Sequence, residues 1–347
     1  MGIPSEGTAD PSSVVDALIR EAGGDPTGFD GRLVAEMIAT SLKLLREGHD
    51  TGQLKLINSA LKEMRYAYRV FNRYSDRRKV SIFGSARTPP GHPDYVAARD
   101  FGQRIAREGW MSITGAGDGI MRAGHEGTQR ESSFGLSIRL PFENNAHQVI
   151  VGDEKLINFR YFFTRKLMFM SHSDAFVICP GGYGTQDEAF ESLVLIQTGK
   201  SSIVPIVLLE GENGTYWETW RRFIIDELLH PKWISPEDVD LFYVARDPAD
   251  AVEHIRRFYG AYHSSRYVGE RLVIRLRREA PPALLVRLTE EFRPLLKEGG
   301  IESSRALEGE TDHLELPRLV LTHNRRHFGL VRRLIDRIND EMGAGLA

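Results

Sequence analysis

Apolar and polar positions follow different periods in three successive zones of the chain. The first zone, residues 1–76, has a helical pattern. Its clearest segment spaces six apolar residues alternately three and four apart: Leu54, Ile57, Leu61, Met64, Tyr68 and Phe71. This spacing places all six on one face of a helix. We expect that face to pack against the protein's own core, with a subunit interface as the alternative.

The second zone, residues 77–263, alternates short apolar runs with helical patterns. The runs predict strands at Val80–Phe83, Met111–Thr114, Phe134–Leu140, Asp174–Cys179, Ile203–Leu209 and Leu241–Val244. Helices are predicted between them, for example over Tyr95–Glu108, Asn158–His172 and Ala189–Gln197. Apolar strands separated by helices are typical of a parallel sheet covered on both faces. The expected fold class is therefore α/β, a Rossmann-like doubly wound parallel sheet, whose ligands bind beyond the carboxyl ends of the strands.

The third zone, residues 264–347, contains both the alternating pattern of strands and the spacing of helices. Leu272–Leu276 alternates like a half-exposed strand, and a second strand is predicted at Leu319–Thr322. Helical patterns cover Ala283–Phe292 and Phe328–Met342, and the polar segment Glu308–His313 is expected to be a loop. The prediction is a helical N-terminal extension (1–76), a central α/β domain (77–263) and a small α+β C-terminal domain (264–347).

Composition and charge narrow the class of protein. The chain has 347 residues, of which 41% are hydrophobic and 27% charged, with a net charge of −3. These values are typical of a globular protein, and without a basic stripe we expect no binding to nucleic acid or to anionic membranes. No apolar run approaches the ~20 residues of a membrane helix. Cys179 is the single cysteine, and Met1–Ser13 lacks the pattern of a secretion signal, so we expect a cytoplasmic protein.

The segment Pro180–Glu188 is the strongest candidate for chemistry. It follows the apolar run Ala175–Cys179 and precedes a helical pattern, so a glycine-rich turn joins a strand to a helix. Glycines let the backbone approach an anion, and the N–H groups at a helix start point at it. Thr185 and Glu188 could be only a capping box. A capping box does not account for the three glycines Gly181, Gly182 and Gly184, which a closely bound phosphate would explain.

Other short motifs in the sequence lack residues that the complete pattern of a known binding site requires. Gly115-x-Gly117-x-Gly119 lacks the next glycine of a dinucleotide fingerprint, because Ile120 stands there, and no acidic residue ends the next strand. A turn that holds an anion or a sugar is the remaining interpretation, and Gly84-Ser85 is a similar turn after an earlier strand. His125-Glu126 begins a zinc-protease motif, but Gln129 replaces the second histidine, and we expect no metal site.

Two motifs together resemble those of a known family. Arg165-Lys166 lies on a helical pattern, and Pro180–Glu188 reads Pro-Gly-Gly-Tyr-Gly-Thr-Gln-Asp-Glu. Both resemble the Lonely guy (LOG) family of phosphoribohydrolases, over a little more than half of the chain. The stretch Gly115–Met121, followed by Leu140-Pro141-Phe142-Glu143, resembles the longer bacterial branch of that family. This chain departs from the family pattern at Phe169, where a methionine is usual, and at Val194, where short members often have a threonine.

The resemblance implies an activity and roles for the motif residues. Family members hydrolyse the N-glycosidic bond of nucleoside 5′-monophosphates such as AMP or cytokinin ribotides, without a cofactor, and form homo-oligomers. Glu188 and Arg165 match the catalytic pair. The expected substrate-binding positions are Lys166, Gly181, Gly182, Tyr183, Gly184, Thr185, Asp187, Glu143, Gly84, Ser85, Gly115 and Gly117.

Placement at a helix start is expected to favour the ionised form of Glu188. The alternative function is a nucleotide-binding sensor that uses the same phosphate-binding turn without catalysis. Decarboxylation of lysine, an older label for the family, would need pyridoxal phosphate on a lysine, and Lys166 is the only lysine inside the motifs.

Overall fold

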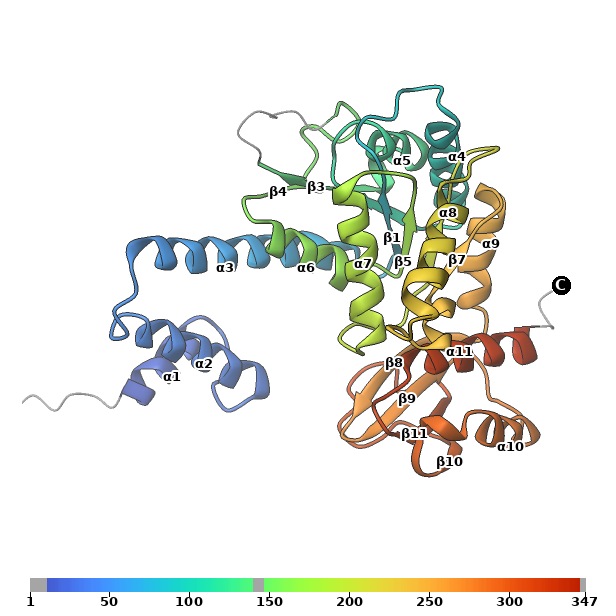
Figure 1. Cartoon of the computed structure of the whole chain (residues 1–347). Helices are drawn as coiled ribbons and strands as arrows, with labels where there is room; N and C mark the ends of the chain where they lie inside the picture. The colour runs from blue at the N-terminus through green and yellow to red at the C-terminus, as the bar shows by residue number, and fades with distance from the viewer. Residues whose placement is uncertain (1–10, 140–146, 344–347) are drawn as a thin grey trace, which may run out of the picture. The chain divides into compact units, whose positions relative to one another are not determined.

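A computed structural model describes residues 11–139 and 147–343 of the chain. The chain divides into two compact units, residues 1–62 and 63–347 (Figure 1). The second unit holds two β-sheets, one after the other in the sequence. Domain boundaries at residues 76 and 263 stay a prediction. None of the helices in the described ranges combines the length and apolar composition that crossing a bilayer requires.

The first unit is helical, as the sequence predicts. It contains α1 (Pro11–Glu21), α2 (Phe29–Lys43) and most of α3 (Thr51–Phe71). Gly28 is the N-cap of α2, and Gly31, in its first turn, packs against the turn before the helix. A Cβ at Gly31 would lie 2.0 Å from the carbonyl oxygen of Asp25, so only glycine fits.

The last turns of α3 belong to the second unit and to its core. Ala67, Val70 and Phe71 are buried, and the ring of Phe71 stacks on Phe134 with centroids 4.5 Å apart. Phe71 therefore meets the expectation of core packing, whereas Tyr68 on the same predicted face is 39% exposed. Ile57, in the first unit, is 41% exposed, and its part in any subunit interface stays a prediction.

The central sheet has seven parallel strands in the order β4-β3-β2-β1-β5-β6-β7, which confirms the predicted fold class. The strands are β1 (Lys79–Phe83), β2 (Met111–Thr114), β3 (Ser133–Ile138), β4 (Leu156–Phe159), β5 (Ala175–Ile178), β6 (Ile206–Leu208) and β7 (Phe242–Val244). The chain runs outward from β1 to β4, then returns to pair β5 with the other side of β1. The strand order therefore reverses between β1 and β5, where open α/β sheets bind their ligands.

Helices cover both faces of this sheet, because successive strand residues point to opposite sides. Val80 and Ile82 join one core with α4 (Pro93–Arg107), α5 (Ile120–Thr128) and α9 (Pro248–Phe258). Phe83 joins the other core with the remaining helices of this region. These are α6 (Phe162–His172), α7 (Tyr183–Gln197) and α8 (Tyr216–Phe223). In Figure 1, α4, α5 and α9 lie on the opposite side of β1 and β5 from α6 and α7.

One strand of the sheet region was missed, and two predicted helices begin at other residues. Asn158 and Phe159 belong to the edge strand β4, which the sequence analysis missed, and α6 begins only at Phe162. In a four-residue strand next to a helix, the alternation of apolar and polar residues is too short to be distinguished from helical spacing. The helix predicted from Ala189 begins six residues earlier, at Tyr183. The predicted strands otherwise differ at their ends by a few residues, and Leu140 lies outside the described residues.

The C-terminal sheet has four antiparallel strands in the order β10-β11-β9-β8. They are β8 (Tyr262–Val268), β9 (Arg271–Leu276), β10 (Leu296–Ser304) and β11 (Arg318–His323), with helices α10 (Pro282–Glu291) and α11 (Phe328–Gly343). Short helical turns complete the fold at Asn72–Tyr74, Arg130–Ser132, Ile224–Leu229, Pro236–Leu241 and Arg293–Leu295. The predicted α+β character is confirmed. The sequence analysis missed β8 and β10 because they are polar and carry few apolar alternations.

The polar loop before β11 has a buried anchor. The Glu310 side chain is fully buried between two arginines, with Oε1 2.7 Å from Nη2 of Arg275 and Oε2 2.8 Å from Nε of Arg318. Burial alone would raise the pKa of Glu310, but hydrogen bonds from Arg318, from the N–H of Leu307 and from Arg275 lower it to about 2. This carboxylate has a partner on each oxygen and ties the loop to β9 and β11.

Candidate active site

A cleft of about 800 Å³ lies where the strand order reverses. Its walls come from the ends of β1, β2 and β5, so it brings together the three glycine-bearing turns of the sequence. The lining residues are Phe83, Gly84, Ser85, Ala86, Arg87, Gly115, Met121, Arg165, Phe169, Gly181, Gly182, Tyr183, Gly184, Thr185, Gln186 and Glu188. Most of the predicted site residues are among them.

Two of the glycines are required by packing within the cleft wall. A Cβ at Gly84 would lie 2.6 Å from the Ile120 side chain, and one at Gly181 would lie 2.1 Å from Oγ1 of Thr185. Gly182 and Gly184 instead face open space. The loop is therefore packed on one side and accessible on the other, which suits the approach of a ligand to the backbone.

The capping-box interpretation of Thr185 and Glu188 is wrong. Gly182 is the N-cap of α7, no side chain caps the helix, and Thr185 is already the third helical residue. The hydroxyl of Thr185 packs against Gly181 instead. Within the described residues, no acceptor is found for the backbone N–H groups of Gly182, Tyr183 and Gly184. These N–H groups are the unpaired donors of a helix start, and they are available to an anion.

Glu188 and Arg165 bring unpaired polar atoms to the same cleft. Glu188 is 5% exposed, and its Oε2 finds no hydrogen-bond partner in residues 11–139 and 147–343. The same holds for the buried Nε of Arg165, whose guanidinium lies 5.0 Å from the ring centroid of Phe162 and 5.9 Å from that of Phe169. Unsatisfied buried polar atoms cost free energy and often mark a place where a ligand completes the bonding.

Burial decides the protonation of Glu188. It raises the pKa of this carboxyl to about 7, although Lys166 and Arg165 act in the opposite direction. The expectation that the helix start would favour the ionised form is therefore not met at Glu188, because loss of solvent outweighs the nearby positive groups. Burial likewise lowers the pKa of Arg165, opposed by Glu188. A carboxyl that titrates near neutral pH can both accept and donate a proton.

Lys166 lies outside the cleft lining and is held by carboxylates. Its Nζ is 2.6 Å from Glu191, 2.8 Å from Asp187 and 3.9 Å from Glu188. Burial alone would lower the pKa of Lys166, but its hydrogen bonds to Asp187 and Glu191 raise it. Asp187 also lies outside the lining, with a side chain 61% exposed. The substrate-binding roles given to Lys166 and Asp187 stay predictions.

The remaining predicted positions differ in their surroundings. Tyr183 lines the cleft with a side chain that is 97% exposed. Gly117 is not in the lining, and a Cβ there would lie 2.8 Å from Cε of Met121. Glu143 lies outside the described residues. Phe169 is buried, and its ring packs edge to face on Phe83, 4.9 Å between centroids, so it forms part of the cleft wall.

Six lining residues were not among the predicted site residues: Phe83, Ala86 and Phe169, and three more. Arg87 follows the turn after β1, Met121 opens α5, and Gln186 lies between the motif residues Thr185 and Asp187. Arg87 had the clearest signal, because a cation two residues after a glycine-bearing turn at a strand end is placed to meet an anion. Met121 has the pattern of an ordinary core residue.

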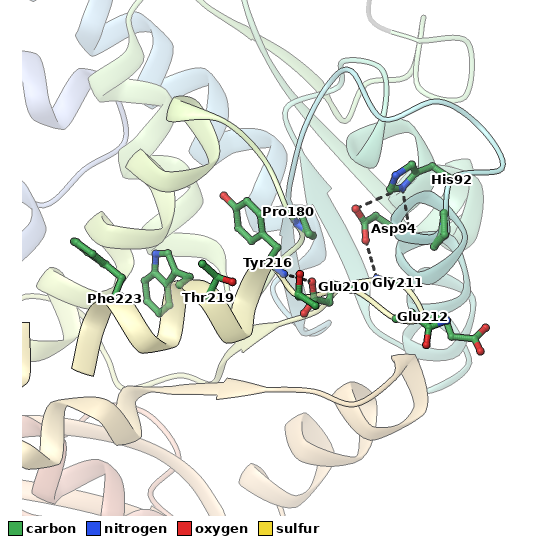
Figure 2. Close-up of a pocket in the computed structure, with 14 residues that line it drawn as sticks. His92, Asp94, Pro180, Glu210, Gly211, Glu212, Tyr216, Thr219 and Phe223 are labelled. Atoms are coloured by element: carbon green, nitrogen blue, oxygen red, sulfur yellow. Dashed lines mark hydrogen bonds and ion pairs between the residues drawn. The ribbon is translucent and has the colours of Figure 1, made fainter. Parts of the chain in front are cut away.

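A second pocket, of about 730 Å³, is lined by Pro180, whose neighbour in the chain, Gly181, lines the cleft (Figure 2). Asp94 accepts a hydrogen bond from the N–H of Gly211, and Glu210 accepts one from the N–H of Tyr216. Figure 2 shows Tyr216 next to Pro180, at the start of α8. Among the described residues, no group of three or more His, Cys, Asp or Glu side chains could hold a metal ion.

Comparison with known proteins bears on the central domain. The family model described as "possible lysine decarboxylase" matches residues 116–255. A probable cytokinin riboside 5′-monophosphate phosphoribohydrolase, LOG4 of Oryza sativa subsp. japonica, is 28% identical over 127 residues, 35% of this chain and 54% of the relative. The Arabidopsis thaliana phosphoribohydrolase LOG3 is 25% identical over 186 residues, 52% of this chain and 83% of the relative.

The central domain is therefore similar to the LOG phosphoribohydrolases. The match spans residues that include Arg165, Glu188 and the glycine-rich loop. The chain covers only about half of the length of the rice relative.

Two solved structures are similar to about half of this chain. The molybdenum cofactor binding protein of Rippkaea orientalis is 20% identical, with a TM-score of 0.36 over 52% of this chain and 96% of that protein. The molybdenum cofactor carrier protein of Chlamydomonas reinhardtii is 21% identical, with a TM-score of 0.35 over 52% of this chain and 97% of that protein.

Proposed function

We propose that this protein hydrolyses the N-glycosidic bond of nucleoside 5′-monophosphates, releasing the free base and ribose 5-phosphate. The activity named for its rice and Arabidopsis relatives supports this class of reaction. AMP and cytokinin ribotides are the substrates we propose to test first.

The observation that carries the proposal is the pairing of two features in one cleft. Free backbone N–H groups at Gly182–Gly184 offer a place for a phosphate, and the buried carboxyl of Glu188 lies one turn further along the same helix. A nucleotide bound by its 5′-phosphate would bring its sugar toward that carboxyl. Arg165 adds a fixed positive charge that can hold an oxygen of the substrate.

The chemistry follows from the charge that develops in the reaction. As the bond between C1′ and the base breaks, positive charge builds on the ribose, and an ionised Glu188 stabilises it. A water molecule forms the new bond to C1′ and gives up a proton, which Glu188 can accept. The departing base takes a proton in turn, so the elements of water are shared between ribose 5-phosphate and base.

The residues do not suit lysine decarboxylation, despite the description of the family model. That reaction uses pyridoxal phosphate joined to a neutral lysine amine. Lys166 is the lysine nearest the cleft motifs, and the carboxylates of Asp187 and Glu191 keep it charged.

We also propose that the protein is a homodimer or a larger homo-oligomer, as the family resemblance implies. Light scattering at micromolar concentration checks this, and a monomeric mass would contradict it.

The test is direct incubation of the protein with a panel of nucleoside 5′-monophosphates, including AMP and isopentenyladenosine monophosphate. Base and ribose 5-phosphate are measured by chromatography and mass spectrometry, with Glu188→Gln as the matched variant. Base release that is lost in the variant supports the hydrolase and ranks its substrates. Binding of AMP without release from any nucleotide would replace the hydrolase with a nucleotide-binding sensor.

A further inference from the structure

A chain of three hydrogen bonds leads from α8 to the glycine-rich loop. Nε1 of Trp220 donates to Oε1 of Gln186 at 2.9 Å, and Nε2 of Gln186 lies 2.7 Å from the hydroxyl of Tyr216. That hydroxyl lies 2.6 Å from the carbonyl oxygen of Gly181. Tyr216 and Trp220 lie on α8, which forms the wall of the second pocket, while Gly181 lines the cleft.

Chemistry fixes the direction of every bond in this chain. A carbonyl oxygen can only accept, so Tyr216 uses its single O–H to donate to Gly181. The tyrosine oxygen must then accept from the amide group of Gln186, whose other atom accepts from the indole N–H of Trp220. Each member has one arrangement available, which makes the chain directional.

Holding the carbonyl of Gly181 also orients the next N–H group. In a planar trans peptide the C=O of one residue and the N–H of the next point in opposite directions. With the Gly181 carbonyl bound to Tyr216, the N–H of Gly182 is directed away from α8. Among the described residues no acceptor is found for that N–H, and a Cβ at Gly182 would meet open space.

Tyr216 is itself firmly placed. Its N–H donates to Oε2 of Glu210 at 2.8 Å, and its ring packs edge to face on Trp217, which is fully buried. Figure 2 shows the contact between Tyr216 and Glu210 at the start of α8. The position of the loop is therefore tied to the core beneath α8.

We propose that Tyr216, with Gln186 and Trp220 behind it, is a positioning residue that orients the Gly182 N–H for the 5′-phosphate of the substrate. The assignment rests on the proposed function for the identity of that substrate. We expect the Gly182 N–H to contact the phosphate equally in the ground state and the transition state, and loss of such uniform binding raises KM without lowering kcat.

The experiment measures binding of ribose 5-phosphate by calorimetry, which needs no turnover. Tyr216→Phe removes only the hydroxyl, and we expect about tenfold weaker binding, as for one lost hydrogen bond to a charged group. With a nucleoside 5′-monophosphate, KM should rise about tenfold while kcat stays within about threefold of wild type. Tyr243→Phe is the control, because the Tyr243 hydroxyl donates to Asp250 away from the cleft. The affinity of this variant for ribose 5-phosphate should stay within about twofold of wild type.

Several results would overturn the assignment. Ribose 5-phosphate binding within about twofold of wild type in Tyr216→Phe would do so, and so would an equal weakening for adenosine, which has no phosphate. If Tyr216→Phe fails to fold, Gln186→Met replaces it, with an expected loss of about threefold, and no loss would equally reject the idea. Wild-type protein that binds ribose 5-phosphate yet releases no base would refute the hydrolase alone.

Discussion

The cleft and the C-terminal sheet each bury a glutamate near arginine, with opposite results. Glu310 has an arginine on each oxygen, and its pKa falls to about 2. Glu188 has an oxygen without a hydrogen-bond partner in the described residues, and its pKa rises to about 7. Burial raises the pKa of both carboxyls, but at Glu310 direct hydrogen bonds outweigh that effect, whereas Oε2 of Glu188 receives none.

Under the proposed function, this contrast separates a structural carboxylate from a catalytic one. Paired charges in a protein interior hold chain segments in place, and removal of one partner leaves the other uncompensated. An unpaired buried carboxyl costs stability but can exchange a proton near neutral pH. The same substitution at the two positions should therefore affect different properties.

The largest expected effect is on catalysis at Glu188. Glu188→Gln keeps the shape of the side chain but removes its negative charge, so base release should fall by about 10³-fold or more. The free energy of unfolding should stay within about 1 kcal/mol of wild type, because no ion pair with good geometry is lost. Assays of base release measure the loss of activity, and chemical denaturation of the same preparations measures the free energy of unfolding. If Glu188→Gln kept more than a tenth of wild-type activity, Glu188 would not be a catalytic residue.

The reverse pattern is expected at Glu310. Glu310→Gln leaves Arg275 and Arg318 buried without their counter-charge, and the free energy of unfolding should fall by about 3 kcal/mol. Activity per folded molecule should not change, since Glu310 belongs to the other sheet. Glu315→Gln, in the same loop but exposed, is the control. Equal stability of the two variants would show that the buried ion pairs contribute nothing net.

A smaller effect on catalysis is expected at Arg165. Arg165→Lys keeps a positive charge but loses the planar donor pair, so kcat/KM should fall about 10²-fold. Steady-state kinetics with the best nucleotide of the panel measure this. Unchanged kinetics would mean that charge alone is needed there.

The smallest effect is a shift in pH dependence. A reaction that needs ionised Glu188 should speed up as pH rises through about 7. Lys166 favours the ionised form, so Lys166→Met should raise the pKa of Glu188 and move the rise in kcat/KM to higher pH. Rates from pH 5 to 9 on both proteins check the direction. A shift to lower pH, or none, would show that Lys166 does not act on Glu188.

Part of the site was predictable from sequence because it is local. The loop Gly181–Gly184 and Glu188 share one strand–turn–helix unit, whose spacing is fixed by the chain itself. Arg165 could be added through the family motif. Tyr216 and Trp220 could not, because about thirty residues separate them from the loop and only the packing of α8 brings them near.

The sequence by itself determined the parallel α/β domain and the glycine-rich turn after its strand, and resemblance to a family added the candidate pair Glu188 and Arg165. The domain and the turn follow from periodicity and short motifs, which depend on neighbours along the chain. Tertiary structure alone decided the pKa of Glu188, the engagement of Lys166 by carboxylates and the chain of bonds that holds Gly181. Burial and hydrogen-bond partners depend on residues far apart in sequence, so no local pattern contains them.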